Sequence, residues 1–269
     1  MHLLRRAVRF SINPAGLDPK GIDGGGSNGA GGVPVSLGLG PWYELEIACR
    51  GEPDPVTGYL VDIKAVDQAV RSQAVPLMER FARTSPQVSP SVVLRQMIGS
   101  LARVLPVHSG LLHVTPTFSL EIFAMAPSVV HLRQMFEFAA SHRLHAEQLS
   151  DEENRKHYGK CNNPNGHGHN YKLQPTVALR IDSDEALRFG LPQLESLVDE
   201  VLIERFDHKH LNLDTEEFAD GSGVIPSVEN IAKVCHDLLA PKIAEASPAA
   251  SLHAITVWET DKTSATYPG

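Results

Sequence analysis

The sequence predicts an α+β protein built from two similar domains in tandem, residues 1–130 and 131–269. Three observations predict this fold class. Each half opens with two strand-like segments, continues with two helical segments, and closes with two further strand-like segments. The two halves therefore repeat one unit, which indicates a duplication. We expect each copy to form a four-stranded antiparallel sheet with two helices on one face.

The opening strands of the two halves match each other without a gap. "VRFSINPAG" in the first half corresponds to "FEFAASHRL" in the second, and "PWYELEIACRG" corresponds to "HNYKLQPTVALRI". A shift of 128 positions sets Phe10 against Phe138 and, unchanged, Tyr43 against Tyr171. The later segment of each pair alternates as a half-buried strand does. In the second half we expect the two segments to pair across a hairpin.

Helices are predicted next in each half. "LPQLESLVDEVLIERF" places apolar residues on one helical face, and its counterpart "VDQAVRSQAVPLMERF" ends on the same Glu-Arg-Phe. A second helix begins at Pro-Ser-Val in both halves, where Ser227 and Ser91 are the expected N-caps. The closing strands are "LHAITVWETDKTSATY" and "LLHVTPTFSLEIFAMA".

Composition excludes several classes of protein. The formal charge of −8 argues against a general nucleic-acid binder, which needs a basic surface. No apolar run approaches the roughly 20 residues of a membrane span, and "MHLLRRAVRF" has charges inside its apolar stretch, unlike a signal peptide. We expect a cytoplasmic protein with no membrane partner. Three cysteines without a CxxC spacing argue against a disulfide framework and against a thiolate zinc cluster.

The candidate metal-binding, catalytic and substrate-binding residues all lie in the second half. In the first half their positions hold other residues: Pro14, Val33, Leu39 and Pro41 stand where the second half has His142, Cys161, His167 and His169. The helices and last strands continue the pattern, with Ala82, Arg83 and Pro116 in place of Asp207, His208 and Glu259. We expect the first domain to be a scaffold. Its glycine-rich stretch, residues 24–32, predicts a flexible surface loop, and a phosphate cradle would need a following Lys-Ser/Thr.

Three histidines have a spacing that suits one metal ion. Residues two apart in a strand point to the same face, so His167 and His169 can present both imidazoles to one ion. His142, on the neighbouring strand, supplies a third. Three neutral histidines with an open fourth position are typical of a catalytic zinc site. Spacing alone leaves three competitors open: His145, His157 and His210.

Four motifs follow one another between residues 134 and 267: "CNNPNGHGHNYK", "FDHKHLN", "PSVENIA" and "WETDKTSATY". Together they resemble the 6-pyruvoyl-tetrahydropterin synthase family, whose tunnelling fold (T-fold) has the predicted strand order. The resemblance implies that His142, His167 and His169 hold Zn²⁺. The first half resembles this fold through the internal repeat only, with no motif of its own.

The resemblance also implies catalytic residues. The family's catalytic cysteine matches Cys161, and its Asp-His dyad matches Asp207 and His208. Cys161 lies in a polar loop beside the expected cation, where a lowered pKa would make its thiolate a base; an inert packed thiol is the alternative. His208 would transfer protons while Asp207 fixes its tautomer and stabilises its charge. A solvated helix end is the alternative for this pair.

Substrate contacts are implied in the same way. The family's pterin-anchoring glutamate matches Glu259, whose carboxylate could accept two parallel hydrogen bonds from a pterin; an exposed strand carboxylate is the alternative. Ser227 and Glu229 could assist, with a plain helix cap as the alternative. Four cations near the motif are candidates for the triphosphate, although loop cations are ordinarily solvated: Arg143, Arg155, Lys156 and Lys160.

The implied enzyme is a zinc-dependent carbon–oxygen lyase. It converts 7,8-dihydroneopterin triphosphate to 6-pyruvoyltetrahydropterin and eliminates triphosphate. Zinc would lower the pKa of the substrate's side-chain hydroxyls, Cys161 would take a proton from that side chain, and His208 would exchange one with a side-chain oxygen. No redox cofactor is required, because the rearrangement is internal.

Two alternatives remain at this point. The 6-carboxytetrahydropterin synthases of queuosine biosynthesis share the zinc histidines, the cysteine and the glutamate, and start from the same substrate. The five residues between Cys161 and His167 resemble the 6-pyruvoyl enzymes, whereas the queuosine enzymes have a shorter spacing. The other alternative is a non-catalytic, zinc-containing pterin-binding protein, which would need neither Cys161 nor the Asp207 and His208 pair.

Assembly is the last expectation from the sequence. A four-stranded sheet leaves edges that must be paired, and the resemblance implies that several domains join into a barrel. We therefore expect a homo-oligomer. Because active sites of the family lie where domains meet, the first domain is expected to wall the pocket of the second, in the same chain or in a neighbour.

Overall fold

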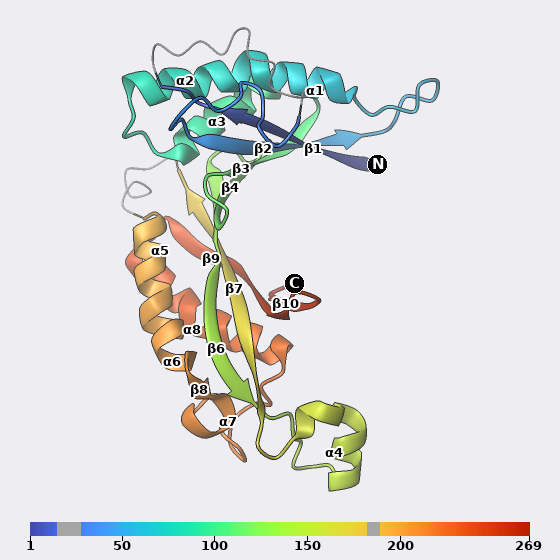
Figure 1. Cartoon of the computed structure of the whole chain (residues 1–269), viewed down its shortest axis with the longest axis vertical. Coiled ribbons are helices and arrows are strands. Elements are labelled where there is room, and N and C mark those ends of the chain that lie inside the picture. The colour runs from blue at the N-terminus through green and yellow to red at the C-terminus, as the bar shows by residue number, and fades with distance from the viewer. Residues whose placement is uncertain (15–27, 182–188) are drawn as a thin grey trace. The chain divides into compact units, whose positions relative to one another are not determined.

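The computed structural model describes residues 1–14, 28–181 and 189–269, and the chain divides into two compact units (Figure 1). The first unit contains Met1–Leu132, and the second contains Arg133–Leu179 and the C-terminal part of the chain. Of the glycine-rich stretch, residues 28–32 are described and form turns, while residues 24–27 lie outside the described part. Within the described residues, none of the helices combines the length and apolarity needed to cross a membrane.

The first unit is an antiparallel sheet with helices along one face (Figure 1). Its strands pair in chain order: β1 (His2–Ser11), β2 (Trp42–Gly51), β3 (Val107–His113) and β4 (Phe118–Phe123). The helical part lies between β2 and β3: α1 (Ile63–Ala69), the π-helical turn η1 (Val70–Ala74), α2 (Val75–Thr84) and α3 (Pro90–Leu101). Alternate strand residues face these helices and are buried, among them Val8, Phe10, Leu45, Ile47 and Leu112. The strand β5 (Val129–Gln134) follows β4 in the chain.

The second unit repeats this order. Its antiparallel strands are β6 (Phe136–His142), β7 (His167–Arg180), β9 (Ala250–Thr260) and β10 (Thr263–Tyr267), and the short β8 (Lys209–His210) pairs parallel with β6. α4 (Asp151–Tyr158) and the 3₁₀ turn η2 (Gly159–Asn162) connect β6 to β7. Between β7 and β9 lie α5 (Leu191–Val198), the π-helical turn η4 (Asp199–Ile203), α6 (Glu204–Phe206), α7 (Leu211–Asp214) and α8 (Val228–Ala246). The predicted α+β content is confirmed.

The strand registers bear out the pairing that the sequence predicts. Phe10 lies opposite Tyr43 in β1 and β2, and Phe138 lies opposite Tyr171 in β6 and β7. In both hairpins these aromatic rings contact each other, with centroids 6.0 Å apart in the first unit and 5.0 Å apart in the second. The two hairpins therefore share one register.

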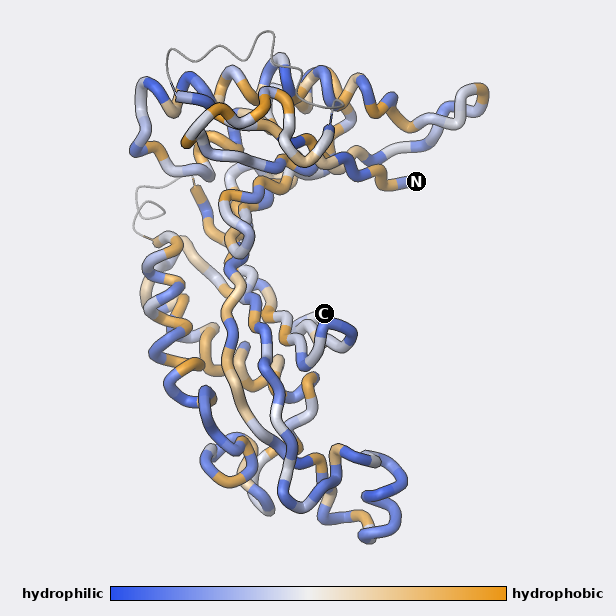
Figure 2. The backbone as a smooth tube through the Cα atoms, in the orientation of Figure 1, coloured by the Kyte–Doolittle hydropathy of each residue, from blue (hydrophilic) through white to orange (hydrophobic). Residues whose placement is uncertain are grey.

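The helices are amphipathic, and Figure 2 shows hydrophobic and hydrophilic residues interleaved along them. In α5, η4 and α6 the fully buried residues recur at every fourth position: Leu194, Val198, Leu202 and Phe206. A spacing of four exceeds the 3.6 residues of an α-helical turn, so this stripe would drift around a regular helix. The wider π turn η4 takes up the excess.

Of the two predicted helix caps, one is confirmed and the other is wrong. Ser227 caps α8, accepting a hydrogen bond from the amide of Asn230 at 3.4 Å. Ser91 does not cap α3, because that helix begins at Pro90 and its cap is Ser89, two residues before the predicted cap. Proline suits the first helical position because its missing N–H would have no partner there.

The assignment of Pro116 as the counterpart of Glu259 is also wrong. Leu45 opposes Leu112 in the first unit, and Leu173, its counterpart 128 positions later, opposes Val257 in the second. Counting two residues onward from Leu112 and Val257 sets Val114, rather than Pro116, at the position of Glu259. The sequence alone could not align the closing strands of the two halves, because these strands share no residue pattern that fixes their register.

Candidate active site

The hairpin of β6 and β7 brings the three predicted histidines together at its end. His142 lies directly opposite His167, and His169 lies opposite Ala140, so all three imidazoles share one face of the sheet. His142 is fully buried, and the other two are half-buried. The Nε2 atoms of His142 and His167 are 3.1 Å apart. Ring contacts link every pair among the three, with centroids between 4.5 and 5.2 Å apart.

A backbone carbonyl fixes the orientation of His142. Its Nδ1 lies 2.7 Å from the carbonyl oxygen of Pro226. Because a carbonyl can only accept, Nδ1 carries the proton and donates, which leaves the Nε2 lone pair facing the other histidines. Burial lowers the pKa of His142 to about 4, and the neighbouring imidazoles add to this effect. The ring is therefore neutral at pH 7, in the tautomer that a metal ligand requires.

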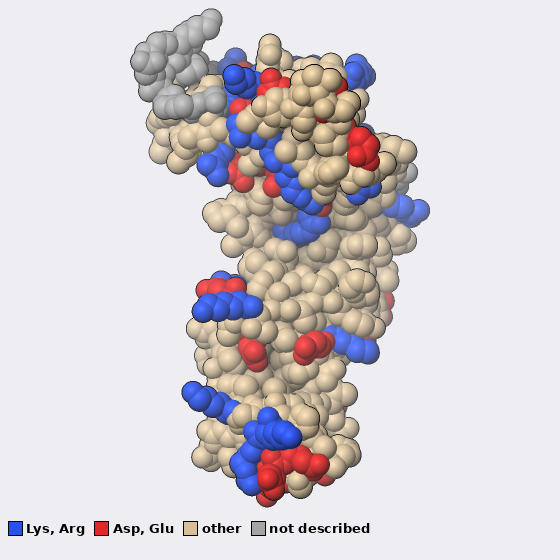
Figure 3. Space-filling model, turned by 90° about the vertical axis from the view of Figure 1, so that its right-hand side faces the viewer, with Lys and Arg blue, Asp and Glu red and all other residues tan. Residues whose placement is uncertain are grey.

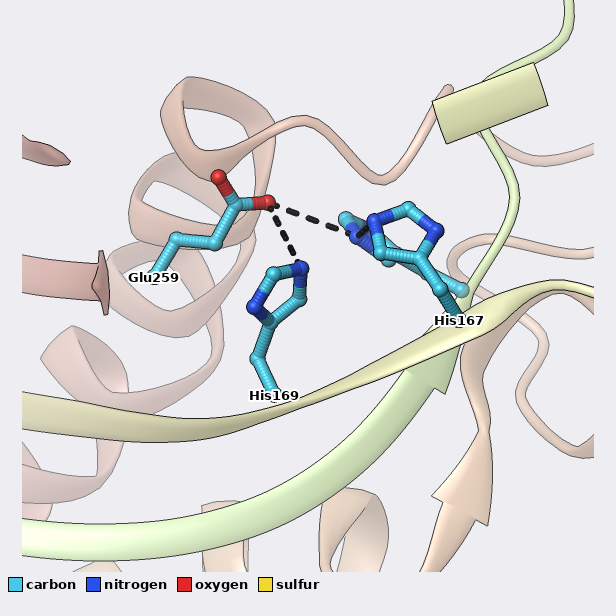
Figure 4. Close-up of side chains that lie close together, drawn as sticks. His167, His169 and Glu259 are labelled. Atoms are coloured by element: carbon cyan, nitrogen blue, oxygen red, sulfur yellow. Dashed lines mark hydrogen bonds and ion pairs between the residues drawn. The ribbon is translucent and has the colours of Figure 1, made fainter. Parts of the chain in front are cut away.

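Glu259, at the end of β9, lies against the same histidines (Figure 4). Its Oε1 is 3.4 Å from Nε2 of His142 and 3.5 Å from Nε2 of His169. The four side chains each offer one ligand atom, and these atoms all lie within 4.8 Å of one another. Sequence analysis placed Glu259 at the pterin but missed its closeness to the histidines, because the pairing of β9 with β7 is a tertiary feature.

The cluster fits a metal ion by its distances and its unpaired atoms. Nitrogen ligands about 2.0–2.1 Å from a tetrahedral zinc ion lie about 3.3 Å from one another. The separations of 3.1, 3.4 and 3.5 Å among the ligand atoms are close to this value. The buried Nε2 of His169 has no hydrogen-bond partner, which is costly for a buried polar atom unless something else binds it.

A glycine allows the turn that leads into the metal site. Gly166 has φ +70°, and its amide donates to the carbonyl of Asn163 at 2.9 Å. A Cβ at this position would lie 2.6 Å from Nε2 of His210 and 3.1 Å from the carbonyl of His142. Only glycine combines this backbone conformation with such a close approach. His210, one of the competitors for the metal, thus packs behind the turn.

Tyr171 is a site residue that sequence analysis used for alignment only. Its hydroxyl lies 3.3 Å from Nδ1 of His142, and its ring is fully buried, stacked on Phe138. Burial raises the pKa of Tyr171, and the charges of Glu259 and Cys161 add to this. The hydroxyl therefore stays protonated. The available signal was its position two residues after His169, on the same face of the strand.

Cys161 is half-exposed in η2, and its backbone carbonyl accepts a hydrogen bond from Leu144 at 2.9 Å. Burial raises the pKa of its thiol, and the carboxylate of Glu259 raises it further. This is the opposite of the direction expected from sequence. The expectation rested on a nearby cation, and a cation held by the histidines would oppose the effect of Glu259.

Asp207 and His208 form a pair at the edge of β6. Asp207 accepts from the amide of Ala139 at 2.8 Å and from Nδ1 of His208 at 2.7 Å. The bond from Ala139 is the largest cause that lowers the pKa of Asp207, and His208 contributes to it. His208 has φ 56°, and its side chain is 84% exposed. Because Ala139 and His142 are three apart in a strand, Ala139 faces away from the histidine cluster.

The dyad is held at the edge of β6 through the backbone of Ala139. An open cavity of about 450 Å³ borders both the dyad and the histidine cluster, because its lining includes His208 and His169. Among the described hydrogen bonds, those of the Asp207 and His208 side chains join them to each other and to Ala139. The structure therefore brings together the three histidines and Glu259, and no described hydrogen bond joins the dyad to them.

The remaining candidates are not part of the cluster that His142, His167, His169 and Glu259 form. His145 Nδ1 lies within hydrogen-bond distance of both Arg143 and Asn162, and His157 is exposed on α4. Glu229 is exposed in the first turn of α8. Basic and acidic side chains lie together at the end of the second unit that carries α4 (Figure 3), which is the pattern of a solvated surface. Three of the triphosphate candidates are exposed in this region: Arg155, Lys156 and Lys160.

Comparison with known proteins assigns the second half to one family. The sequence model of 6-pyruvoyl tetrahydropterin synthase matches residues 131–269, which contain every candidate site residue. The 6-pyruvoyl tetrahydrobiopterin synthase of Poecilia reticulata is 41% identical over 144 residues, covering 54% of this chain and 93% of that protein. The human protein of the same name is 42% identical over 132 residues, covering 49% of this chain and 86% of that protein.

A solved structure covers a similar share of the chain. The 6-pyruvoyl tetrahydropterin synthase of Caenorhabditis elegans is 33% identical, with a TM-score of 0.47, and covers 52% of this chain and 96% of that chain. The sequence matches by themselves cover half of the chain and nearly the whole of their relatives. The chain belongs to the 6-pyruvoyl tetrahydropterin synthase family.

Proposed function

We propose that the chain is a zinc-dependent lyase that converts 7,8-dihydroneopterin triphosphate to 6-pyruvoyltetrahydropterin and eliminates triphosphate. One observation carries the proposal. The half that matches the family gathers His142, His167, His169 and Glu259 with their ligand atoms within 4.8 Å of one another. The tandem T-fold domains, residues 1–130 as scaffold and 131–269 as catalytic domain, form part of the same proposal.

His142, His167 and His169 would hold the metal, since each can offer a neutral ring nitrogen. A zinc ion there would supply positive charge that lowers the pKa of hydroxyl groups on the pterin side chain. The Pro226 carbonyl keeps the His142 lone pair directed inward. Glu259 would turn its carboxylate to the amino group and ring N–H of the pterin, and Ser227, at the start of α8, would border the same pocket.

Cys161 would act as the base that takes a proton from a side-chain carbon. Burial and Glu259 raise the pKa of its thiol, so the thiolate depends on positive charge nearby and on a pterin that pairs with Glu259. His208 would return a proton to a side-chain oxygen, and Asp207 would hold its Nδ1–H. The electrons stay within the substrate, whose C–O bond to triphosphate breaks as the new carbonyl groups form.

The place of the dyad supports an assembly of several chains. The side chain of His208 is 84% exposed, and its described hydrogen bond joins it to Asp207. We therefore propose a homo-oligomer in which the dyad of one chain serves the Cys161 of its neighbour. Pairing of the sheet edges into a barrel would bring these two surfaces together.

A 6-carboxytetrahydropterin synthase is the second candidate, because it would use the same histidines, cysteine and glutamate. The five residues between Cys161 and His167 favour the 6-pyruvoyl reaction. The names of the relatives point the same way.

Product analysis tests the proposal. The full chain, loaded with zinc, is incubated with 7,8-dihydroneopterin triphosphate, and products are identified by mass spectrometry beside Cys161→Ala and a control, Cys49→Ala, which removes a buried thiol from the first unit. We expect 6-pyruvoyltetrahydropterin and free triphosphate from the unchanged chain and the control, and neither from Cys161→Ala. A 6-carboxy product with acetaldehyde would assign the second candidate. No turnover by zinc-loaded protein would contradict both and indicate a pterin-binding protein.

A further inference from the structure

The two residues that follow His142 have their backbone bonded to the side chains of two buried asparagines. β6 ends at His142, and Arg143 and Leu144 come next in the chain. The amide of Arg143 donates to Oδ1 of Asn212 at 2.8 Å, and its carbonyl accepts from Nδ2 of Asn212 at 3.1 Å. The carbonyl of Leu144 accepts from Nδ2 of Asn162 at 2.7 Å. Side chains thus continue the hydrogen bonding of β6 beyond its end.

The turn that carries Cys161 is joined to Leu144 through both backbone groups of Leu144. Its amide donates to the carbonyl of Cys161 at 2.9 Å, and its carbonyl accepts from Asn162. A further bond runs from Nε of Arg143 to the carbonyl of Asn162 at 3.3 Å. Cys161 and Asn162 belong to η2, a 3₁₀ turn whose internal hydrogen bonds have poorer geometry than those of an α-helix. The position of the thiol therefore depends on the bonds to the residues after His142.

The amide of Asn162 has one orientation, because both of its hydrogens are used. Its Nδ2 also lies 3.1 Å from Nδ1 of His145, and a guanidinium nitrogen of Arg143 lies 3.2 Å from the same atom. Since both neighbours bring N–H groups, Nδ1 of His145 accepts. A reversed amide would set its oxygen against the Leu144 carbonyl, where two acceptors repel each other. Asn162 is 7% exposed, so water does not offer it other partners.

The position of Cys161 matters because its thiol belongs to the same cluster as the histidines. The charge of Glu259 raises the pKa of Cys161, and the charge of Cys161 raises the pKa of Tyr171. A misplacement of about 1 Å in a reacting group can cost about a hundredfold in rate. His142 and the bonded residues after it form one continuous stretch of backbone. This stretch therefore sets the thiol relative to the candidate metal ligand.

We propose that Asn162 is a positioning residue that fixes Cys161 relative to His142. Its side chain bonds to Leu144 and His145, so it acts through the backbone of the turn and not on the substrate. The inference rests on the proposed function, because it concerns the base of that reaction. Loss of the Asn162 amide leaves the turn with its bonds from the amide of Leu144 and from Arg143, so the turn is loosened and the metal ligands stay in place.

Steady-state kinetics of the zinc-loaded full chain test the proposal with Asn162→Ala. The matched control is Asn163→Ala, the next residue, whose exposed side chain bonds only to the amide of Asn165 within the turn. For Asn162→Ala we expect kcat per bound zinc ion to fall by about 10- to 100-fold. KM should change by less than about twofold, because Glu259 is untouched. The control should keep both values. A normal kcat per bound zinc ion in Asn162→Ala would overturn the inference and leave Asn162 a purely structural residue.

Alkylation of the metal-free protein by iodoacetamide, followed by peptide mass spectrometry, tests the same geometry without turnover. Burial and Glu259 raise the pKa of the Cys161 thiol, so a loosened turn should react at least about threefold faster at pH 7 in Asn162→Ala and at the unchanged rate in Asn163→Ala. The buried Cys49 and Cys235 are internal references.

Equal alkylation rates in the unchanged chain and in Asn162→Ala would contradict the positioning of Cys161. Faster alkylation in Asn162→Ala, together with an unchanged chain that has no turnover, would refute the proposed function and support the positioning. If Asn162→Ala does not fold, Asn162→Ser takes its place, because the serine side chain is too short to reach the Leu144 carbonyl.

Discussion

The two opening hairpins of the chain share one register and differ at one end. In both, a phenylalanine faces a tyrosine, and the buried residues alternate in the same way. The hairpin of β6 and β7 then continues to the pair of His142 and His167, whereas β1 ends at Ser11 and β2 begins at Trp42. Leu39, which stands at the position of His167, is fully exposed.

This difference separates what holds the fold from what performs the chemistry. The sheet core, the two helices and even the π-helical turn are present in both units. The metal cluster depends on three histidines at the end of one hairpin and on one residue of the adjacent strand. A duplicate can therefore lose the site and keep its core, because the two draw on different residues.

The largest expected effect concerns the dyad, which has Ala82 and Arg83 in its place in the first unit. Under the proposed function, His208→Ala should lower turnover by about 10²- to 10⁴-fold, because the proton-transfer group is lost. Folding should be little changed, since the side chain is 84% exposed. Arg83→Ala, at the equivalent position, should leave turnover unchanged in the same steady-state assay.

Mixed assemblies sharpen this test. Chains carrying Cys161→Ala and chains carrying His208→Ala, inactive alone, are co-expressed and assayed together. If the dyad serves a neighbouring chain, some sites combine an intact Cys161 with an intact His208, and part of the turnover returns. Absence of any recovery in co-purified assemblies would place both groups in the same chain.

The next effect is a pH dependence of the free energy of unfolding that comes from His142. The first unit has no equivalent group, because Pro14 stands at that position. In the metal-free protein burial lowers the pKa of His142 to about 4, from 6.5. The unfolded chain binds this proton first, so the free energy of unfolding should fall as pH drops from about 6.5 to 4, by up to about 3 kcal/mol. Urea unfolding at several pH values measures it. An equal slope in His142→Gln would contradict the assignment.

A matched pair of glycines separates backbone strain from contact with the site. Gly58 and Gly166 both have φ near +70°, but a Cβ at Gly58 meets nothing within 4 Å. Gly58→Ala should cost about 1 kcal/mol of unfolding free energy. Gly166→Ala should cost at least about 2 kcal/mol, because the methyl group would also press on His210. Equal losses in thermal unfolding would mean that the turn can yield.

The smallest expected effect comes from the paired tyrosines. Tyr171→Phe removes the hydroxyl beside Nδ1 of His142, and metal affinity should fall by about tenfold, as for other groups that orient a ligand. Tyr43→Phe should leave metal affinity unchanged. Competition with a chelator of known affinity provides the comparison, and equal affinities in both variants would remove Tyr171 from the site.

The sequence predicts the parts of this molecule that depend on local pattern. The register of both hairpins, the cap at Ser227 and the meeting of His142, His167 and His169 follow from strand periodicity and spacing. The contact of Glu259 with the histidines does not, because it depends on how β9 pairs with β7. Ser91 failed as a cap because Ser89 precedes Pro90 and caps α3 there, whereas an isoleucine precedes Pro226 in the second half. The dyad was placed by motif, and the structure holds it at the edge of β6 through the backbone of Ala139.

The central claim is that one of the two units holds a metal ion, at the three histidines. Metal content per chain, measured by mass spectrometry of purified zinc-loaded protein, tests it most directly in the unchanged chain, in His167→Ala and in Leu39→Ala. The account predicts one zinc ion per chain, retained by Leu39→Ala and lost by His167→Ala. Two ions per chain, or zinc retained at full occupancy by His167→Ala, would contradict it.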